Sequence, residues 1–311
     1  MQKFHNILFV SQGVADETDA LKQALSIARN NKAELKALVV CPELPNEMAK
    51  YKDNYELSLK QQLQKLIQVA REATKVSEVD VPVKIELESG TAPAMRIIRY
   101  GLRNAHDLVI KETEPKEGDK GFKAMDMELL RKCPCPVWLS RAISKKHNEM
   151  RIVVAIDPEN IAPEGHDLSL RLLKLSRSLA DECNGELIII SCWDYVLEDS
   201  LRHSPWIKVG DDELTRVVNE AQNRHRTTLE GLIQKSGIAG KIRVHHVRGD
   251  ATEIIPQYVT DKNIDVLVMG TVARTGIPGF VIGNTAENIV QKLGCSLLAL
   301  KPNGFISPIK L

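Results

Sequence analysis

The chain repeats one order of expected elements twice along its 311 residues. Each copy opens on a short apolar strand, continues through a polar loop into an amphipathic helix, and then enters a second apolar strand. These three segments are residues 6–11, 19–30 and 33–40 in the first copy and 151–157, 167–182 and 185–192 in the second. A duplicated order restricts the chain to a fold that is built twice from one unit.

The remainder of each copy also matches. A long helix with apolar residues at helical spacing is expected at 55–75 in the first copy and at 213–235 in the second. A strand, a glycine turn, a helix, a buried strand and a final strand then follow in both. The strands and turn glycines lie at 81–87, Gly90, 105–110 and 136–139 in the first copy and at 242–247, Gly249, 263–268 and 296–300 in the second.

Strands that alternate with helices predict a parallel sheet, and nearly continuous apolar strands indicate that helices cover both of its faces. We therefore expect an α/β protein with two tandem domains, each a five-stranded parallel sheet, at 1–144 and 145–311. The charged stretch 141–150 is the expected linker. The final strands, near Trp138 and Leu298, are expected to lie side by side, which makes a pseudo-dimer within one chain and covers two sheet edges. The same architecture leaves room for a homodimer of whole chains.

Composition excludes several classes of function. The formal net charge is +1 and 43% of residues are hydrophobic, so we expect neither nucleic-acid nor membrane binding. The apolar run 7–10 is too short for a signal peptide or a membrane span, which predicts a cytoplasmic protein. Of the six cysteines, only Cys133 and Cys135 form a tight pair. No second pair or histidine cluster accompanies them, so we expect a loop there and no metal site.

A glycine-rich loop follows the buried strand of the second copy. It has glycines at 270, 276, 279 and 283, and a helix is expected to begin near Asn284 or Thr285. Glycines let backbone N–H groups approach a phosphate, a helix start adds a positive dipole, and Arg274 adds a cation. The spacing matches neither the P-loop nor the dinucleotide-binding fingerprint. On the pattern alone, a phosphate cradle and a plain connection both stay open.

The loop and the repeated elements together resemble the universal stress protein family. ATP-binding members carry a glycine, two residues, a second glycine, nine residues, a third glycine, and then Ser or Thr. Here these positions are Gly270, Ala273, Gly283 and Asn284. The resemblance covers essentially the whole chain, and two such domains in one chain resemble the tandem, E-type proteins of bacteria. It implies an adenine nucleotide alpha hydrolase-like fold for each domain.

The same resemblance implies ATP, with Mg²⁺, as a ligand of the C-terminal domain, and no cofactor that the protein requires. Asp157 matches the acidic residue that faces the ribose or base, with a loop-capping carboxylate as the alternative. Cys192 lies where backbone groups meet adenine, and a core cysteine is the favoured interpretation of its side chain. The other expected nucleotide contacts are Met269, Gly270, Ala273, Arg274, Gly283, Asn284, Thr285 and Ala286.

Two departures weaken the implied ATP binding. Ala273 replaces a glycine, which costs about 1 kcal/mol if that position needs a positive φ, and its methyl group crowds a phosphate. Asn284 replaces a hydroxyl residue with a larger amide. A smaller anion or a different nucleotide is therefore an alternative ligand.

The first copy keeps the scaffold and loses the expected site. Ser11 is its expected counterpart of Asp157, and the loop 111–121 carries the carboxylates of Glu112, Glu114, Glu117 and Asp119, which repel a phosphate. Asp126 and Met127 lie where Asn284 and its neighbours would donate. We predict that the N-terminal domain binds no nucleotide.

The sequence contains no convincing nucleophile and base pair, so we expect a binding and signalling protein, with weak ATPase activity or autophosphorylation at Thr271 or Thr285 at most. A nucleotide-independent scaffold is one alternative. A carrier of an amphiphilic or lipid-like ligand is another, based on an apolar wall formed by Trp193, Tyr195, Pro205 and Trp206. His245 and His246 lie beside the Gly249 turn and are expected to be packed or solvated.

Overall fold

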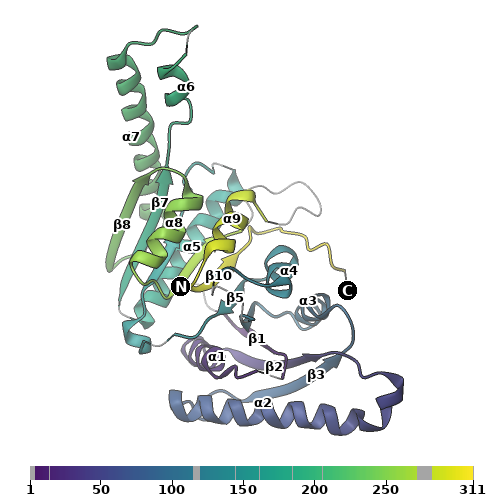
Figure 1. The fold of residues 1–311 in the computed structure, drawn as a ribbon. Helices are drawn as coiled ribbons and strands as arrows, with labels where there is room; N and C mark the ends of the chain where they lie inside the picture. Colours follow the sequence, from purple (N-terminus) through teal and green to yellow (C-terminus); the bar gives the residue numbers. More distant parts are fainter. Residues whose placement is uncertain are drawn as a thin grey trace.

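The computed structural model describes residues 4–310 except 14, 115–119, 144, 161, 184, 205 and 272–281. The strands within these residues form one ten-stranded sheet, in the order β3-β2-β1-β4-β5-β10-β9-β6-β7-β8 (Figure 1). Their bounds are β1 Asn6–Ser11, β2 Glu34–Cys41, β3 Val83–Ser89, β4 Leu108–Glu112, β5 Val137–Ser140, β6 Ile152–Ala155, β7 Glu186–Trp193, β8 Lys241–Arg248, β9 Val266–Gly270 and β10 Ser296–Leu300.

Each half contributes five parallel strands, as expected. Helices cover both faces: α1, α2, α5 and α7 share one apolar core with the sheet, and α3, α4, α8 and α9 share the other. The α-helices are α1 Thr18–Asn31, α2 Lys52–Thr74, α3 Pro93–Arg103, α4 Ala124–Lys132, α5 Pro163–Glu182, α6 Glu198–Arg202, α7 Asp211–Ser236, α8 Ala251–Asp261 and α9 Asn284–Lys292. Short 3₁₀ helices lie at Asn46–Tyr51 and His147–Glu149.

The two halves meet along their last strands. β5 and β10 pair antiparallel, with Trp138 directly opposite Leu298, so the expected side-by-side arrangement is present. Trp138 is only 1% exposed. This register relates the halves by an approximate two-fold axis that passes between Trp138 and Leu298. Arg131 of α4 also pairs with Glu287 of α9, and the chain beyond β10 crosses back onto the N-terminal half (Figure 1).

Three helical features differ from the sequence prediction. α5 begins four residues before the expected position 167, because Pro163 occupies its first turn, where a missing N–H costs nothing. α6 was not predicted, since five residues give no measurable periodicity. α7 ends at Ser236, one residue beyond the expected position 235, and the following Gly237 provides a left-handed C-cap with a φ of 66°. Together α6 and the first part of α7 form an arm that extends beyond the sheet (Figure 1).

No helix within the described residues is both long enough and apolar enough to cross a membrane.

Candidate functional site

The candidate site lies at the carboxyl ends of β6 and β9, which are neighbours in the sheet. Asp157 follows β6 and Gly270 ends β9. The chain leaves these two strands toward opposite faces, since α5 and α9 belong to different cores. The point where a parallel sheet divides in this way is the usual ligand crevice of such folds. Ala273 and Arg274, two of the predicted contacts, lie outside the described residues.

One hydrogen bond joins the two ends of the glycine-rich loop, and a second bond ties its first end to β10. The N–H of Gly283 donates to the carbonyl of Thr271 at 2.8 Å, and the N–H of Thr271 donates to the carbonyl of Leu300 at 3.0 Å. Thr271 is fully buried and its hydroxyl also faces the Leu300 carbonyl, so it is not exposed as a phosphate acceptor. The loop therefore begins and ends beside β10.

The packing of α5 against the end of β9 explains why residue 270 is a glycine. A Cβ at this position would lie 2.9 Å from Cδ2 of Leu168 in α5, closer than a real Cβ contact allows. The first glycine of the motif therefore lets α5 approach the end of β9, whatever the loop binds. Met269 before it is buried in the opposite core.

The start of α9 presents backbone donors. Gly283 is the N-cap residue, and the described residues provide no side-chain cap for this helix. Its first intrahelical bond runs from the N–H of Glu287 to the carbonyl of Gly283. Asn284 and Thr285 are exposed and Ala286 is buried. A helix start of this kind attracts anions through its N–H groups and its dipole.

Asp157 and Cys192 lie on the two neighbouring strand ends, β6 and β7. The exposed Asp157 carboxylate accepts a hydrogen bond through Oδ1 from the N–H of Glu159 at 2.9 Å, which is the loop-capping contact weighed from the sequence. Burial, assisted by the Asp250 carboxylate, raises the pKa of the half-buried Cys192 thiol to about 11. That side chain is therefore a neutral thiol at ordinary pH.

A histidine pair behind this strand end was missed by the sequence analysis. His225 of α7 is 3% exposed, and its Nδ1 lies 2.9 Å from Nε2 of His246 on β8. Burial lowers the pKa of His225, while the carboxylates of Glu159 and Asp157 oppose that shift. Trp193 stacks on His246 with ring centroids 5.9 Å apart. The sequence signal for this pair was His225, which lies among the apolar residues on the buried face of α7.

The predicted apolar wall is only partly assembled. Trp193 and Tyr195 pack with Leu214 and Val218 of α7, so they belong to a small core. Trp206 is 91% exposed and contributes nothing to that core. Pro205 lies outside the described residues. His245 packs against Tyr258 at a centroid distance of 4.8 Å, so the expectation of packed histidines holds for both neighbours.

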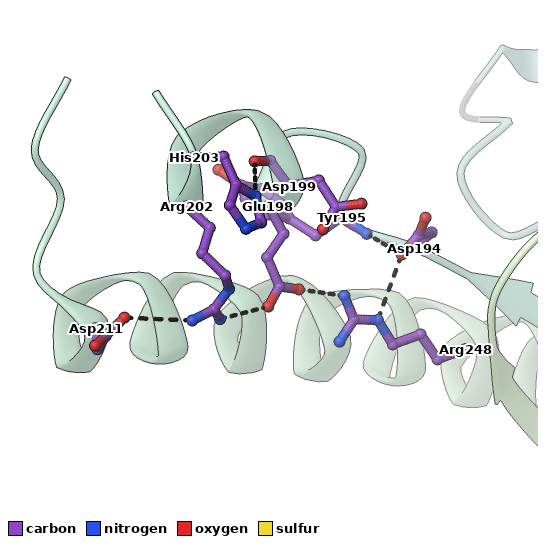
Figure 2. Close-up of polar contacts among 8 residues, drawn as sticks. All are labelled: Asp194, Tyr195, Glu198, Asp199, Arg202, His203, Asp211 and Arg248. Atoms are coloured by element: carbon purple, nitrogen blue, oxygen red, sulfur yellow. Dashed lines mark hydrogen bonds and ion pairs between the residues drawn. The ribbon is translucent and has the colours of Figure 1, made fainter. Parts of the chain in front are cut away.

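Ion pairs fasten α6 beside this core (Figure 2). Glu198 pairs with Arg248 at the end of β8 and with Arg202, 2.9 Å away in α6. Arg202 also reaches Asp211 at the start of α7, and Arg248 reaches Asp194. Glu198 is 16% exposed, whereas its partners are at least 40% exposed, so solvent screens each pair and each contributes little to stability.

The equivalent place in the N-terminal half is filled by its own side chains. Strand register makes Met269, Gly270 and Ala286 the counterparts of Lys111, Glu112 and Asp126. Lys111 Nζ lies 2.9 Å from Asp126 Oδ1, and the two side chains are 2% and 0% exposed. The closed charge pair of one half is thus replaced by uncharged residues in the other.

The side chains of Glu112 and Gln12 lie beside this pair, and we call the group of Lys111, Asp126, Glu112 and Gln12 the plug. Glu112 Oε2 accepts a hydrogen bond from the N–H of Ala20 in the first turn of α1. Burial, and then the neighbouring carboxylates led by Glu17, raise the pKa of Glu112 to about 7.

The strand register also corrects one expectation from the sequence. Ile7 and Ile152 occupy equivalent positions, so the counterpart of Asp157 is Gln12 and that of Ser11 is Ile156. Gln12 donates to Glu114 at 2.8 Å.

Comparison with known proteins agrees with this duplicated architecture. The family model described as "Universal stress protein family" matches residues 3–141 and 150–301. The chain belongs to the universal stress protein family. The expected boundary between residues 144 and 145 stays a prediction.

Curated relatives match this chain along its whole length. Universal stress protein E of Photorhabdus laumondii is 29% identical over 318 residues, which cover 100% of this chain and 99% of the relative. Universal stress protein E of Escherichia coli K12 is 26% identical, with 100% and 98% covered. A functionally unknown protein from Pseudomonas aeruginosa PAO1 has the same fold, with a TM-score of 0.72, 24% identity, and 96% and 93% of the two chains covered.

Proposed function

We propose that this universal stress protein is a non-enzymatic, cytoplasmic stress-response protein that binds an adenine nucleotide, such as Mg-ATP, in its C-terminal domain. The observation that carries the proposal is the difference between the halves at one structural position. Lys111 and Asp126 close that position in the N-terminal half, whereas Met269 and Ala286 leave it without charge in the C-terminal half. We propose that the N-terminal half binds no nucleotide.

The proposed arrangement follows from the groups at the strand ends. The N–H groups at the start of α9 would hold the phosphates, because a helix start favours anions. The exposed carboxylate of Asp157 would accept hydrogen bonds from ribose hydroxyls. The neutral thiol of Cys192 would lie against the base without repelling it.

One helix would link ligand binding to the seam between the halves. Thr285 and Glu287 are two residues apart in the first turn of α9. Thr285 lies on the proposed phosphate side, and Glu287 pairs with Arg131 of the N-terminal half. A nucleotide that orders this turn would therefore stabilise the seam, which is the route by which occupancy would alter partner binding.

A charge placed at Thr285 tests the proposal. The Thr285→Glu variant sets a carboxylate in the first turn of α9, where it stabilises the helix by about 0.3–1 kcal/mol and repels a phosphate. Asn288→Glu adds the same charge to an exposed position one turn later and serves as the control. Isothermal titration with Mg-ATP should give binding in the wild type and control, and at least tenfold weaker binding in Thr285→Glu.

Equal binding by both variants would place the ligand elsewhere. No binding by the wild type would favour the nucleotide-independent scaffold, which the alanine at position 273 supports. The amphiphilic carrier has less support, because Trp206 is 91% exposed and forms no wall.

A further inference from the structure

Two thiols face each other where α4 leads into β5. Sγ of Cys133 and Sγ of Cys135 are 3.3 Å apart and share a hydrogen bond across Pro134. Both are free cysteines. Cys133 is 1% exposed, and Cys135 is the less buried residue of the pair. The described residues add no third metal-ligating side chain to form a metal cluster.

A buried cation lies against this pair from the other half of the chain. Lys301 follows β10 and is 5% exposed. Its Nζ donates to the carbonyls of Leu130 at 2.6 Å and Cys133 at 2.8 Å, which caps the end of α4. Burial lowers the pKa of Lys301 to about 8, and the two thiols oppose that shift. Within the described part of the chain, no carboxylate forms an ion pair with Lys301.

The fold itself does not require this chemistry. Arg141 is the counterpart of Lys301 across the approximate two-fold axis, and it also donates to a helix-end carbonyl, that of Leu293. Leu293 stands where the other half has Cys133, so the C-terminal half retains a single thiol, Cys295, at this place. The same place in the C-terminal half is therefore built without a thiol pair. A buried ammonium without a carboxylate is costly unless another anion compensates it, and a thiolate is the anion available here.

We propose that Cys133 and Cys135 are a redox-active thiol pair, which hydrogen peroxide converts reversibly into a disulfide with the help of the Lys301 ammonium group. The sulfur of Cys135, the less buried residue, attacks the peroxide, forming an S–O bond and breaking the O–O bond, and the released hydroxide takes the thiol proton to become water. The sulfur of Cys133 then attacks this sulfenic acid. An S–S bond forms, the S–O bond breaks, and the oxygen leaves as a second water with the proton of Cys133.

The positive charge and the small ring define how the pair behaves. The Lys301 ammonium stabilises the thiolate, which is the form that reacts. A disulfide between residues two apart closes a small, strained ring, and strained disulfides are the readily reduced ones. The pair is therefore suited to a reversible response to peroxide, in which a thiol such as glutathione reduces the disulfide again. It is not suited to permanent cross-linking. This site is separate from the nucleotide site and does not depend on it.

The test uses the whole chain and follows the thiols by mass. Purified protein is treated with hydrogen peroxide, the remaining thiols are alkylated, and peptide mapping locates any disulfide. We expect a Cys133–Cys135 disulfide that dithiothreitol reverses. Cys135→Ser should abolish it, while Cys183→Ser, which removes a cysteine elsewhere, should leave it unchanged. Lys301→Met keeps the buried stem and should slow disulfide formation about tenfold, while Lys310→Met in the exposed tail should not.

Circular dichroism confirms that each variant is folded before the rates are compared. Full alkylation of Cys133 and Cys135 after peroxide treatment would overturn the proposal. A stable sulfinic acid on Cys135 in place of the disulfide would overturn it as well, because Cys133 would then have failed to resolve the sulfenic acid. An unchanged rate in Lys301→Met would overturn the role of the lysine.

Discussion

Replacing Lys111 by methionine should strongly lower the free energy of unfolding, because it leaves the buried Asp126 carboxylate without its partner. Lys111 Nζ donates to Asp126 Oδ1 at 2.9 Å and to the carbonyl of Glu112 at 2.7 Å. Without it, the fully buried Asp126 keeps one long hydrogen bond, from the N–H of Glu114 at 3.4 Å. An unpaired buried carboxylate costs about 3–5 kcal/mol of the free energy of unfolding.

The C-terminal half supplies the matched double variant. Lys111→Met with Asp126→Ala introduces the residue types that Met269 and Ala286 provide at the equivalent positions. Removing both charges also removes the unpaired carboxylate, and apolar replacement of a buried ion pair is often neutral or stabilising. We expect the double variant to unfold within about 1 kcal/mol of the wild type, so the two changes are strongly non-additive.

Urea denaturation followed by circular dichroism and tryptophan fluorescence measures these free energies. Burial raises the pKa of Asp126 although Lys111 opposes this, so the lone carboxyl of Lys111→Met takes up a proton readily. The cost of that single change should therefore shrink as the pH falls. A single variant that loses less than about 1 kcal/mol, or a double variant that loses the sum of both singles, would refute this account of the plug.

Three further outcomes follow from individual side chains. The pKa of Glu112 is raised from 4.5 to about 7, so its contribution to stability is complete below 4.5 and is lost as the pH rises toward 7. Glu112→Gln should remove this part of the pH profile in urea titrations. Gly270→Ala should lower the free energy of unfolding by about 1–3 kcal/mol through its clash with Leu168, whereas Gly231→Ala on open helix surface should raise it by about 0.4–1 kcal/mol. Trp206→Ser should change the melting temperature very little, because this side chain is 91% exposed. A large drop in the melting temperature would instead support an apolar wall that includes Trp206.

The sequence predicted the features that recur along the chain. The duplicated order of strands and helices indicates two parallel sheets with helices on both faces, and the final strands pair at Trp138 and Leu298 as expected. These features are encoded locally, in apolar periodicity and turn residues, so one sequence suffices to find them. The opening of α5 at Pro163 was missed because its first turn is polar.

Which residues come together in each site depends on the strand register and on contacts between residues far apart in the sequence. Gln12 replaced Ser11 as the counterpart of Asp157 only when the strand pairing was visible, because a shift of one residue is not resolved by apolar pattern. The contact between Lys301 and Cys133 joins residues 168 positions apart, which no local pattern predicts. Lys111 and Asp126 were visible as charges, but their burial against each other was not.

The most direct test of the central claim is the stoichiometry of nucleotide binding, measured by native mass spectrometry of the whole chain with and without Mg-ATP. We expect one nucleotide per chain, retained when Lys111 and Asp126 are both replaced and bound at least tenfold more weakly by Thr285→Glu. Two nucleotides per wild-type chain would contradict the closed N-terminal half. An adduct that forms equally well in Thr285→Glu, or none in the wild type, would contradict the phosphate site at the start of α9.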